Sequence, residues 1–113
     1  MSVATQDGWA LEKVIEARVG STFIIRLWED RTRGELYVPV YDSKALALVN
    51  DDYERTIGES AEVIDAGKRA FEFRALEAGA HRIVFEKRMG WKFTAEDRRV
   101  YLVTVGGEDG SYA

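Results

Sequence analysis

Residues 70–87 read AFEFRALEAGAHRIVFEK, and two alternating runs in this stretch decide the fold class. Every second residue of each run can face one side of an extended chain: Phe71, Phe73 and Ala75, then His81, Ile83 and Phe85. A period of two is the pattern of a half-buried strand. Gly79 lies between the runs, where a turn often needs the positive φ that glycine adopts easily. The stretch therefore predicts two strands joined by a turn.

Three further runs extend this pattern along the chain: STFIIRLW at 21–28, ELYVPVY at 35–41 and RRVYLVTV at 98–105. Pro39 favours an edge position or a bulge for its run, because proline cannot donate a backbone hydrogen bond. The last run is apolar almost throughout from Val100, which indicates a strand covered on both faces. Short strands at this spacing predict an all-β sandwich or barrel. The side chains expected in its core are Phe71, Phe73, Ile83, Phe85 and Leu102.

Two segments allow a helix as well as a strand. Residues 9–20, WALEKVIEARVG, place Leu11, Val14 and Ile15 at helical spacing and end in a glycine. Residues 43–50, SKALALVN, begin with a serine and end with an asparagine, two residue types that cap helices. Periodicity alone leaves both segments open.

The composition indicates one compact domain over residues 1–113. A chain of 113 residues, 46% of them hydrophobic, suffices for one core and not for two. It has no cysteine, which excludes disulfides and thiolate chemistry. A net charge of −4 argues against a nucleic-acid partner, and no run approaches the ~20 apolar residues of a membrane span.

The opening residues, MSVATQDGWA, lack a basic segment followed by a long apolar run, so they do not read as a signal peptide. We therefore expect a cytoplasmic protein, or a secreted or periplasmic one if the sequence is a trimmed form of a longer chain. We also expect a monomer that needs no cofactor.

Catalytic patterns are missing from the sequence. His81 is the only histidine, and without a G-x-S-x-G motif it reads as a structural or surface residue. The adjacent pairs Asp51-Asp52 and Glu96-Asp97 diverge in an extended chain, and we interpret both as solvated turns. There is no phosphate-binding glycine motif and no His/Asp spacing typical of a metal site. A binding protein is the interpretation that remains, and not an enzyme.

The runs and their connections, taken in order, resemble the chagasin family of cysteine-protease inhibitors. The similar stretches are VGSTFIIRLWEDRTRGELYV, ALALVNDDYE and AGKRAFEFRALEAGAHRIVFEKRMGW, and the resemblance covers about residues 14–105. It implies an all-β, immunoglobulin-like antiparallel β-sandwich of seven or eight strands, with 9–20 as a strand. It also implies that three loops at one end of the sandwich wedge non-covalently into the active-site cleft of a papain-like cysteine protease.

The family's loop motifs are Asn-Pro-Thr-Thr-Gly-aromatic, a glycine-rich loop and Arg-Pro-Trp. Residues 30–35 keep a threonine and the glycine without the proline, residues 64–69 keep one glycine, and residues 88–93 keep the tryptophan without the preceding Arg-Pro. The resemblance implies that the protease-binding residues are Asp30, Arg31, Thr32, Arg33, Gly34, Ala66, Gly67, Arg88, Met89, Gly90 and Trp91.

These altered motifs leave two functions open. Proline stiffens a loop before binding, so its loss raises the ordering cost, and Arg31 and Arg33 beside Thr32 have to stay hydrated or meet acids. The first function is reversible inhibition of a papain-like cysteine protease. The alternative is a non-inhibitory immunoglobulin-like interaction module that kept the framework. Trp91 is accordingly either an exposed anchor or a ring packed against Trp28 or Tyr37.

Overall fold

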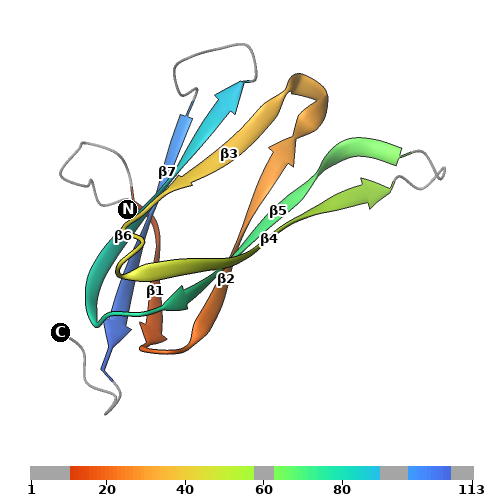
Figure 1. The fold of residues 1–113 in the computed structure, drawn as a ribbon. Helices are drawn as coiled ribbons and strands as arrows, with labels where there is room; N and C mark the ends of the chain where they lie inside the picture. Colours follow the sequence, from red (N-terminus) through yellow and green to blue (C-terminus); the bar gives the residue numbers. More distant parts are fainter. Residues whose placement is uncertain (1–10, 58–62, 90–96, 108–113) are drawn as a thin grey trace.

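The structure is a computed structural model that describes residues 11–57, 63–89 and 97–107. Seven strands and one short 3-10 helix cover these residues (Figure 1). In chain order they are β1 (Leu11–Arg18), β2 (Thr22–Asp30), η1 (Arg31–Arg33), β3 (Glu35–Val40), β4 (Leu46–Ile57), β5 (Val63–Ala75), β6 (Gly79–Met89) and β7 (Asp97–Gly106). The predicted all-β class is confirmed.

The strands form two sheets that pack face to face (Figure 1). One sheet has the order β1-β7-β6-β3, and the other has the order β2-β5-β4. The pair β1–β7 is parallel, and the other pairs are antiparallel. Because β1, β2, β3 and β5 are each followed by a strand of the opposite sheet, the chain crosses repeatedly between the layers, as in an immunoglobulin-like sandwich.

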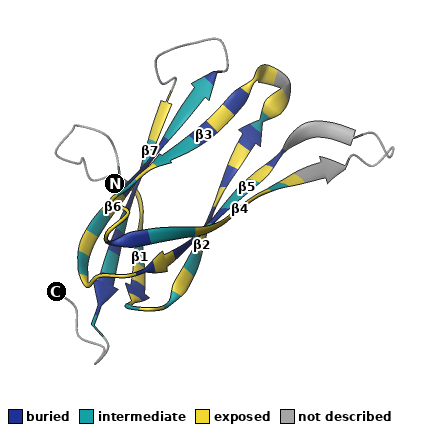
Figure 2. Cartoon of the chain, in the orientation of Figure 1, coloured by how far each residue is buried: buried dark blue, intermediate teal, exposed yellow. Residues whose placement is uncertain are grey.

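The core lies between the sheets and is built on the alternation that opens the sequence (Figure 2). Phe71, Phe73, Ile83 and Phe85 have no exposed surface, which confirms four of the five predicted core positions. The fifth, Leu102, was assigned wrongly and is only partly buried. Its register partners explain this, because in the antiparallel ladder it lies opposite Arg82, on the face turned away from Ile83 and Tyr101.

The last strand is covered on both faces at its centre, as its apolar run indicates. Val100 on one face has no exposed surface, and Tyr101 on the other is 7% exposed. Pro39 lies in β3, which is an edge strand of its sheet, as the lack of an N–H donor requires.

Neither ambiguous segment is a helix where the structure describes it, and each consists of a strand with a turn at one end. Leu11–Arg18 forms β1 and pairs with β7. Residues 43–45 form a turn in which the Asp42 carboxylate accepts a hydrogen bond from the Lys44 amide, and β4 then begins at Leu46. The interpretation of Asp51-Asp52 as a solvated turn is wrong, because both residues pair with β5 inside β4. Pairing with a neighbouring strand decides these segments, and local spacing does not.

Three connections lie at one end of the sandwich because of this topology. They join β2 to β3, β4 to β5 and β6 to β7; the structure describes the first, residues 31–34, and of the other two it describes the strand ends, Ile57 and Val63, and Met89 and Asp97. The second predicted loop, 64–69, is wrong in position: β5 already begins at Val63, and Gly67 pairs with Glu29 on one side and Arg55 on the other. In the described part of the chain no helix is long and apolar enough to span a bilayer.

Candidate functional site

Of the three predicted loops, the β2–β3 connection is the one that the described backbone forms as a turn. β2 ends at Asp30, and Arg31–Arg33 form a single 3-10 turn. The Gly34 amide donates a hydrogen bond of 3.0 Å to the Arg31 carbonyl, and Gly34 has φ of 77°. Only glycine adopts this left-handed conformation without strain, so the residue can end the turn and return the chain to β3.

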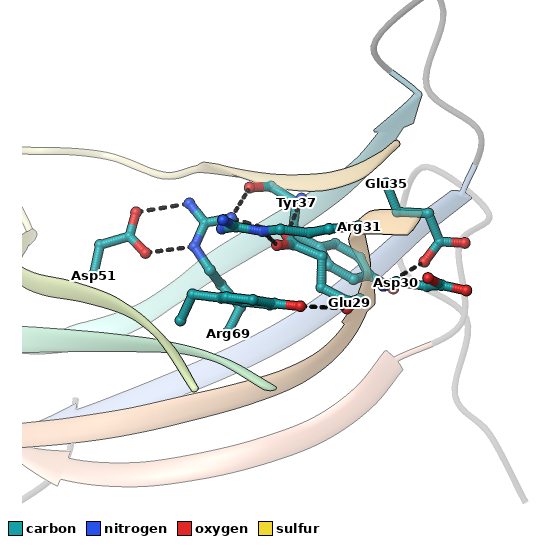
Figure 3. Close-up of polar contacts among 8 residues, drawn as sticks. Glu29, Asp30, Arg31, Glu35, Tyr37, Asp51 and Arg69 are labelled. Atoms are coloured by element: carbon teal, nitrogen blue, oxygen red, sulfur yellow. Dashed lines mark hydrogen bonds and ion pairs between the residues drawn. The ribbon is translucent and has the colours of Figure 1, made fainter. Parts of the chain in front are cut away.

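A buried carboxylate lies at the base of this connection (Figure 3). Glu29 follows Phe23, Ile25 and Leu27 on the inward face of β2 and has no exposed surface. Its Oε1 accepts a hydrogen bond of 2.9 Å from Arg31 Nε. A buried ionised carboxylate is tolerated only when it is paired and hydrogen-bonded, so its other oxygen needs partners as well.

Those partners come from both sheets. Glu29 Oε2 accepts a hydrogen bond of 2.8 Å from the Tyr37 amide on β3 and another of 2.9 Å from Arg69 Nη1 on β5. The Arg69 guanidinium also donates through Nε and Nη2 to the Asp51 carboxylate on β4, at 2.5 and 2.8 Å. These hydrogen bonds, that to Asp51 above all, raise the pKa of Arg69 above its ordinary value. The ionic cluster Glu29–Arg31–Arg69–Asp51 therefore links β2, β4, β5 and the β2–β3 connection, and through Tyr37 reaches β3.

An aromatic ring supports the loop arginine from the other side. The Arg31 guanidinium lies 3.7 Å from the ring centroid of Tyr53, within the range of a cation–π contact. The Tyr53 hydroxyl donates a long hydrogen bond, 3.5 Å, to the Glu29 carbonyl. Arg31 is therefore fixed by a carboxylate and by a ring, although 37% of its side chain is exposed.

A second carboxylate holds the other end of the connection. Glu35 is 8% exposed, and its Oε1 accepts a hydrogen bond of 3.1 Å from the Asp30 amide. Its Oε2 lies 3.6 Å from Arg33 Nη1 and 3.7 Å from Lys87 Nζ. Of the two outcomes left open for the loop arginines, both meet acids of the chain itself, Arg31 at Glu29 and Arg33 at Glu35, while 67% of the Arg33 side chain also stays exposed to solvent.

The third predicted loop lies partly in a strand. Arg88 and Met89 are the last residues of β6, so their assignment to a loop is wrong. Arg88 donates a hydrogen bond of 2.5 Å to the Glu86 carboxylate. Met89 is 8% exposed and pairs with Glu35 of β3. An apolar side chain that continues the inward row of β6 packs inside the sandwich, which explains its burial. Gly90 and Trp91 lie outside the described residues, as do the side chains of Thr32 and Ala66.

Strand register nevertheless brings the predicted segments together. Ala66 pairs with Asp30 across the β2–β5 ladder, and Met89 pairs with Glu35 across the β3–β6 ladder. The two residues that bound the β2–β3 connection are thus direct neighbours of the other two predicted segments. Sequence reasoning missed Glu29, Tyr53 and Arg69. The one available signal was a glutamate at the inward position of an alternating apolar run.

The chemistry of this end is that of binding. Within residues 11–57, 63–89 and 97–107 no three metal-ligating side chains gather at one point. His81 Nε2 lies 2.8 Å from the Glu77 carbonyl at the opposite end of the sandwich, which agrees with the interpretation of His81 as a structural or surface residue. The arrangement presents an ordered connection backed by buried ion pairs, a form suited to docking against a partner.

Comparison with known proteins assigns the family. The model of the chagasin family peptidase inhibitor I42 matches residues 16–105. None of the curated proteins compared with the chain matches it. The crystal structure of the cysteine protease inhibitor EhICP2 from Entamoeba histolytica is similar with a TM-score of 0.72 and 16% identity, over 82% of this chain and 86% of that one. The solution structure of amebosin is similar with a TM-score of 0.59 and 24% identity, over 84% of this chain and 90% of that one.

These similarities confirm the cysteine-protease-inhibitor fold, and the family match confirms that the chain is not an enzyme. It belongs to the chagasin family of peptidase inhibitors.

Proposed function

We propose that this chain is a reversible, non-covalent inhibitor of papain-like cysteine proteases, acting as a monomer through the connections at one end of its sandwich. Family membership supports a protease as partner, and EhICP2, which shares the fold, is itself a cysteine protease inhibitor. The observation that carries the proposal is the register of Asp30 with Ala66 and of Glu35 with Met89. It brings three separate segments to one edge, which is what insertion into a single cleft requires.

The ordered β2–β3 connection answers the objection raised by the missing proline. A binding loop loses affinity when it has to be ordered on association. Here a 3-10 turn, the left-handed Gly34 and the two carboxylates Glu29 and Glu35 hold the connection before binding. The loop is thus stiffened by ion pairs in place of proline.

The proposed contact surface combines described and undescribed residues. Arg33, with 67% of its side chain exposed, and the exposed Gly34 would approach the active-site cleft from the β2–β3 connection. Thr32 and Trp91 would contact the cleft as the family resemblance implies, with Trp91 as the aromatic anchor. The binding contribution of Arg88, Gly90, Ala66 and Gly67 stays a prediction.

Titration against papain and a cathepsin with a fluorogenic substrate tests the proposal. We expect rapid, stoichiometric loss of activity that returns on dilution. If the proteases keep their full activity at tens of micromolar inhibitor, any binding is weaker than that concentration and the proposal is rejected.

One observation favours the second candidate, a non-inhibitory interaction module. Trp28 is 54% exposed and Ile24 46% exposed, and both lie on the outer face of β2, away from the inward Glu29. Exposed aromatic side chains on a sheet face are typical of interaction surfaces. A Trp28→Ala variant separates the candidates, because inhibition through the connections does not involve this face.

A further inference from the structure

Glu29 occupies a position that the fold itself would fill with an apolar residue. The inward row of β2 runs Phe23, Ile25, Leu27 and Glu29, and the glutamate is as buried as the residues of the core. Replacing a buried ion pair by apolar residues is often neutral or stabilising. Stability is therefore a weak explanation for a charge here, and the partners of the carboxylate point to another one.

Of the partners of Glu29 among the described residues, one belongs to the predicted binding surface. Tyr37 and Arg69 lie on β3 and β5 and hold Oε2, whereas Arg31 holds Oε1 and is the first residue of the β2–β3 connection. The Glu29–Arg31 contact thus transmits the rigidity of the two sheets to the connection. The Arg31 carbonyl in turn accepts the Gly34 amide, which closes the turn.

We infer that Glu29 is a positioning residue, whose buried carboxylate holds Arg31 and with it residues 31–34 in the conformation that meets the protease. Glu29 does not touch the partner and acts only through Arg31. This inference rests on the proposed function for its effect on inhibition, while its effect on the connection can be measured on the free protein.

Glu29→Gln is the first variant, because it keeps the shape of the side chain and removes its charge. We expect the amides of Arg33 and Gly34 to exchange with deuterium about 10-fold faster, since opening the turn no longer breaks a charged contact. We expect the inhibition constant for papain to rise on the order of 10- to 100-fold, the equivalent of one hydrogen bond to a charged group. Amides at the centres of β5 and β6 serve as the internal reference.

Asp51→Asn is the matched control. Asp51 accepts two hydrogen bonds from Arg69 in the same cluster, but among the described residues its hydrogen bonds do not reach the connection, and 35% of its side chain is exposed. This variant should leave both the exchange at Arg33 and Gly34 and the inhibition constant within about twofold of the parent protein, as expected for a site outside the coupled pair. Equal effects of Glu29→Gln and Asp51→Asn would reduce Glu29 to a structural residue and overturn the inference.

A double-mutant cycle with Arg31→Gln completes the test. If Glu29 acts through Arg31, the double variant should inhibit no worse than the weaker of the two single variants. Fully additive losses would overturn the inference. Should Glu29→Gln fail to fold, Arg31→Gln breaks the same contact from the exposed side, and unchanged exchange at Gly34 in that variant again rejects the positioning role.

Failure of the proposed function gives a different result. If the parent protein inhibits neither papain nor a cathepsin, the inhibitor proposal falls. The exchange measurement then still decides whether Glu29 holds the connection.

Discussion

Arg69 Nη1 lies 2.9 Å from Glu29 Oε2, so that a cation from β5 neutralises a fully buried anion on β2. The same guanidinium lies 4.7 Å from the ring centroid of Phe71, the next inward residue of β5. The apolar core thus ends in a buried ion pair at the end of the sandwich that carries the three connections. Arg69 also pairs with Asp51, whose side chain is 35% exposed, so the buried pair and the solvent-accessible pair of the same guanidinium can be compared.

Arg69→Met should destabilise the protein strongly. Methionine fills a similar volume but takes the cation away from Oε2 of the buried Glu29, which then keeps Arg31 at Oε1 as its remaining cation; removing one partner of a buried ion pair costs up to about 3–5 kcal/mol. Asp51→Asn instead removes the charge of a partner of Arg69 that solvent reaches, and we expect a loss of stability of about 1 kcal/mol or less. Chemical denaturation of both variants measures the difference. Similar losses would show that solvent screens Glu29 as well.

Phe73→Ala should cost about 3–5 kcal/mol, because it empties the centre of the sandwich. Phe73 has no exposed surface and contacts the rings of Phe23, Tyr41 and Phe85, at centroid distances of 5.8, 5.1 and 6.4 Å. Leu76→Ala is the control, since Leu76 is 44% exposed just beyond the same strand, and it should cost about 0.5 kcal/mol or less. A loss below about 1 kcal/mol for Phe73→Ala would contradict the packing described here.

Residues that alternate locally could be assigned from the sequence, and residues that depend on distant partners could not. Phe71, Phe73, Ile83 and Phe85 follow a period of two and face the core. Gly67 looked like a turn because it borders an apolar run, but pairing on both sides keeps it in β5. Strand pairing overrides the local preference of a single glycine.

The candidate site, like the core, could be predicted where local sequence decides it and not where distant residues meet. The β2–β3 connection was placed correctly by its glycine and by the end of the alternating run. The ion pair that holds it joins Glu29 to Arg69, 40 positions later, and no local pattern links the two. Leu102 shows the same limit within the core, because an apolar run covered on both faces does not reveal which residues point inward.

The stability of the outer face of β6 should depend on acid pH. The hydrogen bond from Arg88 lowers the pKa of Glu86 below its ordinary value of 4.5. A group with a depressed folded pKa contributes stability above the unfolded pKa and loses it as the pH falls through the folded pKa. Below about pH 4.5 the Tm of the parent protein should therefore fall, and the Tm of the Glu86→Gln variant should fall less over the same range. Parallel melting curves of the two proteins check this, and identical slopes would remove Glu86 as a contributor.

Trp91→Ala should separate scaffold from binding surface, with Trp28→Ala as its matched control. If Trp91 is the anchor, its loss should change the unfolding midpoint little and weaken inhibition of papain by at least about 30-fold, the scale of an interface hot spot of ~2 kcal/mol. Trp28, 54% exposed on the outer face of β2, should tolerate alanine with both quantities unchanged. A sharp drop in the midpoint of Trp91→Ala would make that residue part of the scaffold. An unchanged midpoint with undiminished inhibition would place the anchor elsewhere, and binding lost in Trp28→Ala alone would move the working surface to the outer face of β2.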